Sequence, residues 1–399
     1  MDIPFFDDDT VPYSSEFSFN TKLLDDPIWG TSERRRRIHA MRRKAGRLLV
    51  GQSVARCGGY VSAATRDELG RDWACVYKGK HSAFLGHVIS CGSVWHCPYC
   101  AARIAKQRRL EVAETMRRHL QAGGHVWMGT FTVPHHKFSR CKELRESLAV
   151  AFRRLQSGRR WLRWKETAGV VGSIRGMEVT HGGAGWHPHL HVLFFVDCHP
   201  KTAEAFGAWL YQEWARIVSK LGLGECSEGA WNWRFCNSPN AAGDYVAKWG
   251  ADWELTHGHL KIAKGKSDTE EANRSPWQIL QDFAVHSWPG DGDLFREYAL
   301  AFKGARQLTW SRGLKEAYSI DDLGDSDIVQ ALEEEEASAI IAVEAPAVRQ
   351  LTEMGKTCEL LEAVERGGYE GGLNFMWGLG LHAYVSPPQK VLKGLFCLP

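Results

Sequence analysis

Three histidines alternate in the stretch GWHPHLHVLFFVD, residues 185–197, and lead into an apolar run. Side chains project alternately from the two faces of a β-strand, so His187, His189 and His191 share one face. A purely structural strand would favour Val or Thr at such positions. The pattern therefore indicates either a hydrated face or a face that binds a ligand.

A carboxylate on the preceding strand could complete a site. The glycine-rich segment HGGAGW, residues 181–186, predicts a hairpin loop, and the resulting register sets Glu178 opposite His189. Two neutral imidazoles and one carboxylate suit a divalent ion such as Mg²⁺ or Mn²⁺ and leave positions for water or phosphate. We therefore predict a catalytic metal site formed by Glu178, His189 and His191. We expect His187 to contact either the substrate or these ligands.

Five of the eleven cysteines fall within residues 57–100, and the segment CGSVWHCPYC holds three of them. A C-x-x-C pair in a chain without secretory features is more typical of zinc binding than of a disulfide. A redox pair is the alternative, but the βαβ context of a thioredoxin is absent. We predict a structural zinc bound by Cys75, Cys91, Cys97 and Cys100. The alternatives for the fourth ligand are Cys57, His87 and His96.

Charge is distributed unevenly along the 399 residues. Residues 1–30 carry seven acidic residues and one lysine, and residues 321–372 carry fourteen acidic residues against three basic ones. The chain between them is strongly basic, which favours a polyanionic partner such as nucleic acid over a merely solubilising role. The acidic tail either binds a partner or folds back on the basic surface. The predicted DNA contacts lie on a basic helix: Arg103, Lys106, Arg108 and Arg109.

The sequence also indicates the class of protein and its compartment. No apolar run approaches the roughly 18 residues that cross a bilayer, and the acidic N-terminus is unlike a signal peptide. We therefore expect a cytoplasmic protein with no membrane partner. The run of four arginines at residues 34–37 is either an arm on phosphates or an exposed helix face.

Alternating and helical patterns from residue 125 onward follow the order β-α-β-β-α-β-α, which is typical of a ferredoxin-like sheet with an added helix. We therefore expect an α+β fold with a ferredoxin/RRM-like antiparallel sheet. Helices are predicted at 140–165, 201–222 and 276–320. The expected divisions are a flexible basic arm at 1–50, a zinc-binding module with a basic helix at 51–122, the sheet-containing core at 123–264, and a helical C-terminal region with an acidic tail at 265–399.

The strand HPHLHVLFF resembles the His-hydrophobic-His motif of the HUH endonucleases, specifically the single-tyrosine initiators of rolling-circle plasmid replication. Three further segments are similar to parts of this family. Two are the motifs GTFTVPHH at residues 129–136 and DYVAKW at residues 244–249, and the third is the region that holds SPWQIL, FREYALAFKGARQLTWSRGL (295–314) and the acidic helical tail. The ordered set is more specific than any single motif, and the resemblance covers about residues 50–370. It implies that the core is an HUH endonuclease domain.

This resemblance implies metal-dependent, site-specific nicking of single-stranded DNA and strand transfer through a 5′-phosphotyrosyl intermediate. Tyr245 would be the nucleophile, and Lys248 would stabilise phosphate charge or orient the site. Some relatives carry a water-activating glutamate where this chain has Ala241. The implied partners are single-stranded or hairpin origin DNA and host replication proteins such as a helicase.

Two alternatives remain open at this point. A transposase or relaxase of the HUH type would use the same site chemistry. A non-catalytic zinc-ribbon protein that binds nucleic acid would use the histidines structurally, and Tyr245 would then be an aromatic core residue. That protein would bind DNA equally well after Tyr245→Phe and would form no covalent product.

Overall fold

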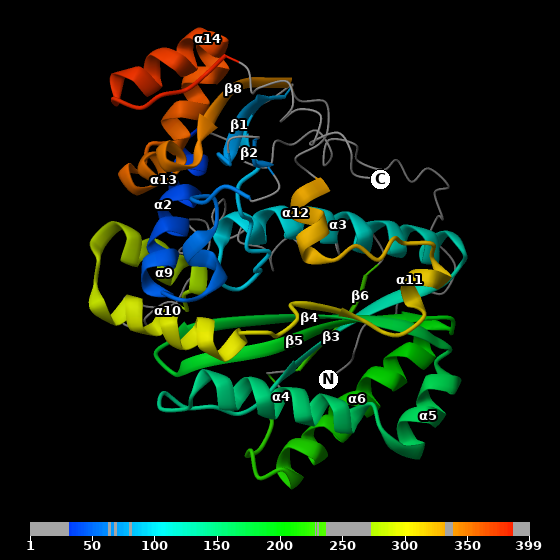
Figure 1. The fold of residues 1–399 in the computed structure, drawn as a ribbon. Helices are drawn as coiled ribbons and strands as arrows, with labels where there is room; N and C mark the ends of the chain where they lie inside the picture. Colours follow the sequence, from blue (N-terminus) through cyan, green and yellow to red (C-terminus); the bar gives the residue numbers. More distant parts are fainter. Residues whose placement is uncertain are drawn as a thin grey trace.

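The computed structural model shows a mixed α+β fold with two antiparallel sheets (Figure 1). The α+β class expected from the sequence is confirmed at this level. The structure describes residues 32–62, 65–67, 70–79, 82–227, 229, 231–236, 273–331 and 338–385.

The strands and helices are bounded as follows. The strands are β1 (Trp73–Lys78), β2 (Ala83–Gly86), β3 (His125–Thr132), β4 (Val170–Gly182), β5 (Gly185–Val196), β6 (Asn232–Phe235), β7 (Leu308–Trp310) and β8 (Ser338–Glu344). The helices are α2 (Ser32–Leu48), η1 (Ser53–Arg56), α3 (Pro98–Gln121), α4 (Cys141–Leu155), α5 (Gly158–Thr167), α6 (Pro200–Lys220), α9 (Pro276–His286), α10 (Pro289–Phe302), α11 (Leu314–Ala317), α12 (Asp325–Ala331), α13 (Ala345–Met354) and α14 (Thr357–Gly378).

The larger sheet has five strands in the order β6-β3-β5-β4-β7. Helices α4, α5 and α6 lie on one face, and α3 lies on the other (Figure 1). Successive side chains of a strand point to opposite faces of the sheet and so contribute to a hydrophobic core on each face. In β5, Phe194 packs toward α6, whereas Leu193 and Phe195 pack with Met116 of α3. The sheet is therefore buried on both faces, and a polar group on it must have a specific partner.

Two predicted helical segments differ in detail from the structure. The segment 140–165 forms two helices, because Gly158 adopts a φ of +87° and begins α5 in a new direction. The segment 276–320 contains α9 and α10 as expected, but it also contains the edge strand β7. A strand of three residues carries too little periodicity to be recognised within a helical context.

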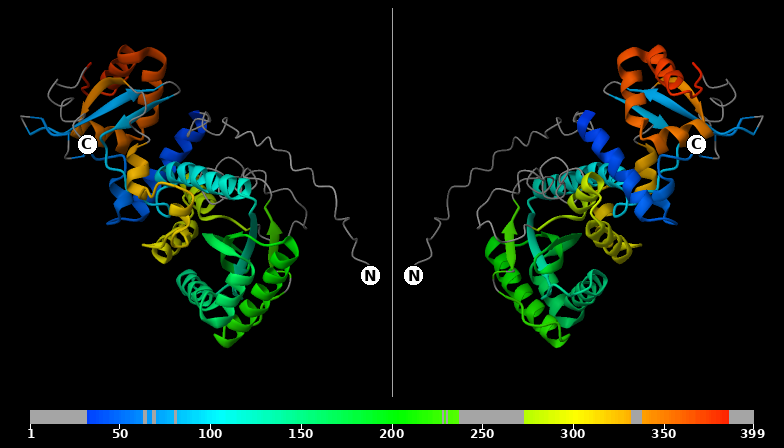
Figure 2. Two further views of the ribbon diagram at one scale, coloured as in Figure 1. Left: turned by 90° about the vertical axis from the view of Figure 1, so that its right-hand side faces the viewer. Right: turned by 90° about the vertical axis from the view of Figure 1, so that its left-hand side faces the viewer.

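The smaller sheet has the order β2-β1-β8, and it joins segments far apart in the chain. Trp73 of β1 pairs with Glu344 of β8, so the C-terminal region contributes a strand to the sheet of the cysteine-containing segment. Helices α13 and α14 pack on this sheet through Val348, Leu361 and Met376. Figure 2 shows the two sheets at opposite ends of the molecule, with α2 and α3 between them.

Helix α2 connects the basic N-terminal segment to the acidic C-terminal one. Its Ile38 and Met41 are fully buried, which differs from the flexible arm expected there. Arg35 donates two hydrogen bonds to the carboxylate of Glu365 at 2.5 and 2.8 Å, and Arg36 pairs with Glu362. The acidic tail thus folds back on basic residues at this position. Among the described helices, none has the length and apolar character needed to span a membrane.

Candidate metal centres and nucleic-acid interface

The hairpin of β4 and β5 forms in the predicted register. Glu178 pairs with His189 and Thr180 with His187, and the turn is closed by Gly182 and Gly185. Gly185 has a φ of +84°, and a Cβ there would lie 2.9 Å from a backbone atom of Lys137. Only glycine fits at this position of the turn. The glycine-rich segment from which the hairpin register is predicted is therefore required by steric constraints.

Glu178, His189 and His191 form one compact group on the face of the sheet that α3 also covers. The Glu178 Oε2 atom lies 3.1 Å from Nε2 of His189 and 3.1 Å from Nε2 of His191. All three side chains are largely buried, with exposed fractions of 16%, 13% and 5% in this order along the chain. Two imidazole nitrogens and a carboxylate oxygen converge here, which is a donor set that suits a divalent ion.

The remaining ring nitrogens have partners that orient the two imidazoles. Nδ1 of His191 lies 3.0 Å from the Thr130 hydroxyl, and Nδ1 of His189 lies 3.2 Å from the His187 carbonyl oxygen. A carbonyl oxygen can only accept, so Nδ1 of His189 carries the hydrogen and its Nε2 keeps a lone pair toward Glu178. This arrangement of outer partners is the one that metal-binding histidines use.

The electrostatics of the group favour an ionised carboxylate. Burial acts to raise the pKa of Glu178, but the adjacent imidazoles of His189 and His191 outweigh it and hold that pKa well below its usual range. Burial lowers the pKa of His191. Burial, together with the neighbouring His189 and His135, lowers the pKa of His187 to about 4. The imidazoles of His187 and His191 are therefore neutral at pH 7, as a metal ligand must be.

His187 lies beside this group. Its ring stacks on His135, with centroids 4.6 Å apart, and lies 5.2 Å from the ring of His189. The group of converging donor atoms contains Glu178, His189 and His191 and does not include His187. The alternating pattern thus gives two members of the group and one neighbour.

Four thiols form a second group between the two sheets, at the start of α3. The Sγ atom of Cys57 lies 3.6 Å from that of Cys97 and 3.7 Å from that of Cys100, and Cys91 lies 3.7 Å from Cys100. These separations are much longer than a disulfide bond. A tetrahedral zinc with bonds of about 2.3 Å would hold its sulfurs about 3.8 Å apart. The spacing of the thiols therefore fits a Cys₄ zinc site.

The fourth member of this group is Cys57, and the expectation of Cys75 is corrected. Cys75 is fully buried in β1 and packs with Trp73 and Ala342 in a separate cluster. Burial raises the pKa of its thiol to about 11, and its Sγ is not among the four that converge. The other two alternatives have different partners: His87 Nε2 with Tyr77 Oη, and His96 Nε2 with the Ala299 carbonyl.

A buried arginine lies next to the thiols. Arg42 is 4% exposed, and its guanidinium lies 5.0 Å from the centre of the Tyr99 ring. Within the described part of the chain it forms no ion pair with a carboxylate. Burial acts to lower its pKa, and Cys57 and Cys97, followed by Tyr99 and Cys358, raise it. A buried guanidinium requires a counter-charge, which thiolates of a Cys₄ metal site would supply.

The predicted DNA contacts on α3 are mostly engaged within the protein. Arg103 is 3% exposed and contacts Tyr99, so it faces the core rather than solvent. Arg108 pairs with Glu111 and with Asp325. Lys106 and Arg109 are half-buried. The spacing of the basic residues indicates a basic face on α3. That α12 and the large sheet cover this face follows from tertiary packing, which the sequence does not reveal.

Tyr245, Lys248 and Ala241 lie outside the described residues. Sequence reasoning missed Thr130 and His135, both of which contact the histidines of β5. Thr130 lies within GTFTVPHH and shares a face with the site through its pairing with His191. That pairing joins strands that are not consecutive in the chain, so no loop length could reveal it.

Comparison with known proteins points to replication. The family model Rep_1, described as a replication protein, matches residues 83–214. The chain is 26% identical to "Protein rep" of Streptomyces lividans over 62% of this chain and 67% of that protein. It is 31% identical to "Neomycin resistance protein" of Streptomyces cyanogenus over 27% of this chain and 31% of that protein. No solved structure matches the chain. The expected resemblance to plasmid replication initiators is confirmed by these matches.

Proposed function

Because residues 83–214 match a family of replication proteins, we propose that this protein initiates rolling-circle replication of a plasmid. It would nick one DNA strand at a specific site and transfer that strand through a tyrosine. The observation that carries the proposal is the group of Glu178, His189 and His191, whose ligating atoms converge on one face of a sheet. The sheet order β6-β3-β5-β4 also matches the order expected of a ferredoxin-like HUH core.

The chemistry assigned to these residues is phosphodiester cleavage. Glu178, His189 and His191 would hold a divalent ion, Mg²⁺ or Mn²⁺, which when bound polarises the scissile phosphate. The Tyr245 oxygen would attack phosphorus and lose its proton, and the bond from phosphorus to the 3′ oxygen would break. The 3′ oxygen would gain a proton and leave as a free hydroxyl, and the 5′ phosphate would remain on the tyrosine. Lys248 would stabilise charge on the phosphate.

The remaining parts of the chain would support this reaction. A zinc ion at Cys57, Cys91, Cys97 and Cys100 would fix the start of α3 relative to η1. Lys106 and Arg109 remain candidates for contacts with origin DNA, whereas the burial of Arg103 and the ion pairs of Arg108 speak against those two. The proposed partners are single-stranded or hairpin origin DNA and a host helicase.

The test uses purified full-length protein and single-stranded oligonucleotides tiled across its own plasmid. Reactions with Mn²⁺ or with EDTA are resolved on a denaturing gel, and mass spectrometry locates any adduct. We expect a metal-dependent adduct on Tyr245 that disappears in Tyr245→Phe and in His189→Ala. An adduct on a different tyrosine would reject Tyr245 as nucleophile. Intact DNA binding without an adduct on any tile would favour the non-catalytic zinc-ribbon alternative.

A further inference from the structure

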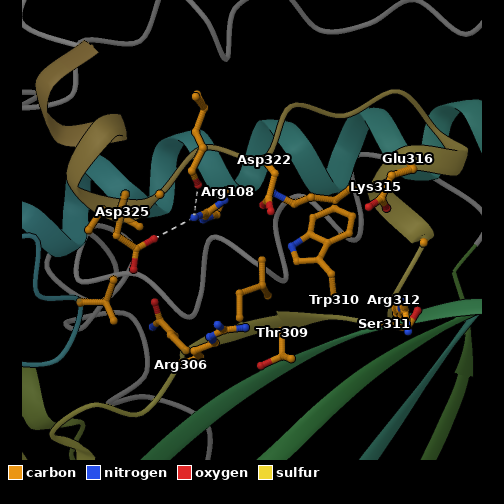
Figure 3. A pocket seen from close by; sticks show the side chains of 17 residues that line it. Arg108, Arg306, Thr309, Trp310, Ser311, Arg312, Lys315, Glu316, Asp322 and Asp325 are labelled. Carbon is orange, nitrogen blue, oxygen red and sulfur yellow. Dashed lines mark hydrogen bonds and ion pairs between the residues drawn. The ribbon is translucent and has the colours of Figure 1, made fainter.

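A polar cavity of about 430 Å³ lies between β7, α3 and the segment that joins α11 to α12 (Figure 3). Strand β7 is at the edge of the large sheet, so the cavity opens beside the last strand rather than within the core. Both positive and negative side chains line it: Arg108, Arg306, Arg312, Lys315, Glu316, Asp322 and Asp325.

The strand register connects this cavity to the metal-ligating group. Ile174 of β4 pairs with Trp310 of β7, and the Met177 amide donates to the Gln307 carbonyl, so the chain next to Arg306 runs along β4 one residue before Glu178. Ile174 and Glu178 project from the same face of β4, because they are separated by an even number of residues. The side of β7 that lines the cavity is therefore on the same face of the sheet as Glu178 and the histidines. Strand β7 neighbours β4, which carries Glu178, and β5, which carries the histidines, is the next strand.

The charges around the cavity are only partly balanced. Two cations are neutralised by neighbouring carboxylates: Arg108 by Asp325 at 2.8 Å, and Lys315 by Asp322 at 2.9 Å. Arg306 and Arg312 are exposed, and neither forms an ion pair with a carboxylate in the described part of the chain. Glu316 also lines the cavity and forms no ion pair in the described part of the chain. The lining thus carries four basic and three acidic side chains, and its net charge is +1.

The cavity also presents a hydrogen-bond donor that lacks an acceptor. The indole Nε1 of Trp310 is buried and has no hydrogen-bond partner among the residues that the structure describes. Lys315 lies 5.2 Å from the centre of the same ring, on its face. Figure 3 shows the nitrogen-bearing edge of the indole turned toward the middle of the labelled side chains. A buried donor without an acceptor is unfavourable, so a ligand with oxygen acceptors would be stabilised here.

We propose that this cavity binds the sugar-phosphate backbone of the DNA strand immediately next to the phosphate that is cut. Arg306 and Arg312 contact phosphate oxygens, and the Trp310 indole donates to an oxygen of the same segment. The inference rests on the proposed function, because it takes the group at Glu178 as the point of cleavage. Two arginines and one donor recognise backbone oxygens and leave base identity to other contacts.

The first test measures DNA affinity by fluorescence anisotropy. The probe is the labelled oligonucleotide that the full-length protein nicks, and binding is measured at several salt concentrations in EDTA. The variant Arg306→Ala/Arg312→Ala is compared with Arg159→Ala/Arg163→Ala, which removes two exposed arginines from α5 on the opposite face of the sheet. We expect the first variant to lower affinity by about tenfold or more and to reduce the salt slope by about 1.4. Equal effects of the two variants would overturn the proposal.

The second test locates the contact along the strand. Single phosphates on each side of the nick are replaced by neutral methylphosphonates, and binding is measured for the wild type and for Arg306→Ala/Arg312→Ala. We expect one or two replacements next to the nick to weaken the wild type several-fold and to have no further effect in the variant. Trp310→Phe keeps the ring but removes the donor, and a few-fold loss at the same replacements is expected. The same profile in all proteins would reject the proposal.

These outcomes separate the cavity from the catalytic assignment. If the wild type nicks no oligonucleotide, the proposed function fails before any cavity variant is made. If nicking occurs but dAMP binds to the cavity in the wild type and not in the variant, while DNA affinity is unchanged, the cavity is a site for free nucleotides. That result would overturn the inference and leave the proposed function intact.

Discussion

The two imidazoles beside Glu178 are held by different kinds of partner. His189 donates from Nδ1 to a backbone carbonyl, whereas His191 depends on the side chain of Thr130 at 3.0 Å. A backbone partner cannot be removed by mutation, but the threonine hydroxyl can. Thr130 is therefore the position at which the orientation of one ligand can be changed without altering any ligand.

We expect Thr130→Val to weaken metal binding and nicking by about 10- to 100-fold, because the ring of His191 loses the hydrogen bond that fixes it. Thr132→Val is the matched control, since Thr132 lies on the same strand and its side chain has no hydrogen bond to either histidine. The measurement is the Mn²⁺ concentration that gives half-maximal nicking. Similar values for both variants would show that Thr130 does not position His191.

The cysteine group gives a second prediction at this scale. Cys57→Ser should remove most of the bound zinc, because Cys57 supplies one of the four converging thiols that a tetrahedral zinc site requires. Cys75→Ser should retain zinc, since its thiol lies in a separate buried cluster. Zinc content of the purified proteins, measured by atomic emission, decides between them. Zinc loss in Cys75→Ser with retention in Cys57→Ser would contradict the arrangement of thiols in the structure.

Which site residues the sequence predicts depends on how near along the chain their partners lie. Glu178 and His189 are eleven residues apart across a tight turn, so counting from the turn was sufficient. Cys57 lies forty residues before Cys97 in the chain. Neither periodicity nor spacing in the sequence shows that Cys57, rather than Cys75, is the fourth thiol of the group. Burial and strand pairing decide this choice, and both come from tertiary packing.

At the scale of elements, the ion pairs between α2 and α14 make stability depend on pH. Burial acts to raise the pKa of Glu365, but hydrogen bonds from Arg35 and from the Ala83 backbone hold it below its usual value. A carboxyl group with a depressed folded-state pKa stabilises the fold above its unfolded-state pKa. This contribution disappears as the pH falls through the folded-state pKa.

We expect Glu365→Gln to lower the free energy of unfolding by about 1–2 kcal/mol at neutral pH, because the buried Arg35 loses its charged partner at 2.5 Å and keeps only Glu362, at 4.0 Å. The difference between wild type and variant should shrink as the pH falls from neutral through the depressed pKa of the wild-type carboxyl group, where that group becomes protonated. Thermal melting across this range is the measurement. Glu359→Gln is a suitable control on the same helix, because its side chain is more exposed. A difference that is constant with pH would contradict this account.

Elements with strong local signals were predicted well, and those defined by distant partners were not. The hairpin strands and α6 have clear periodicity, glycine turns or a proline at the first helical position. Strands β7 and β8 lie in segments that read as helical or acidic. Each forms because the unpaired backbone N–H and C=O groups of a strand distant in the sequence require hydrogen-bond partners. That requirement arises only in the folded sheet and leaves no pattern in the segment itself.

At the scale of the whole molecule, acidic segments are placed against basic ones. Asp322 and Asp325 lie against Lys315 and Arg108, and Glu362 and Glu365 lie against α2. The uneven charge of the sequence is therefore partly cancelled within the fold. DNA affinity should depend on the cations that remain uncompensated more than on total charge.

The pairing of β1 with β8 also predicts how the two sheets differ in stability. A chain that ends at residue 331 would lack β8, α13 and α14 and would expose the apolar residues that they cover. We expect fast hydrogen exchange at β1 amides in this variant, and slow exchange at β5, whose partners β3 and β4 are retained. Exchange measured by mass spectrometry tests this. Protection of β1 in the shortened chain would show that β8 is dispensable.

The same pairing bears on the order in which the protein is made and folds. Trp73 meets Glu344 across about 270 residues, whereas the β4–β5 hairpin closes over a two-residue turn. On the ribosome, the five-stranded sheet can acquire all its strands before β8 has been synthesised. The small sheet is therefore the last to close, because it cannot form until the ribosome has synthesised β8.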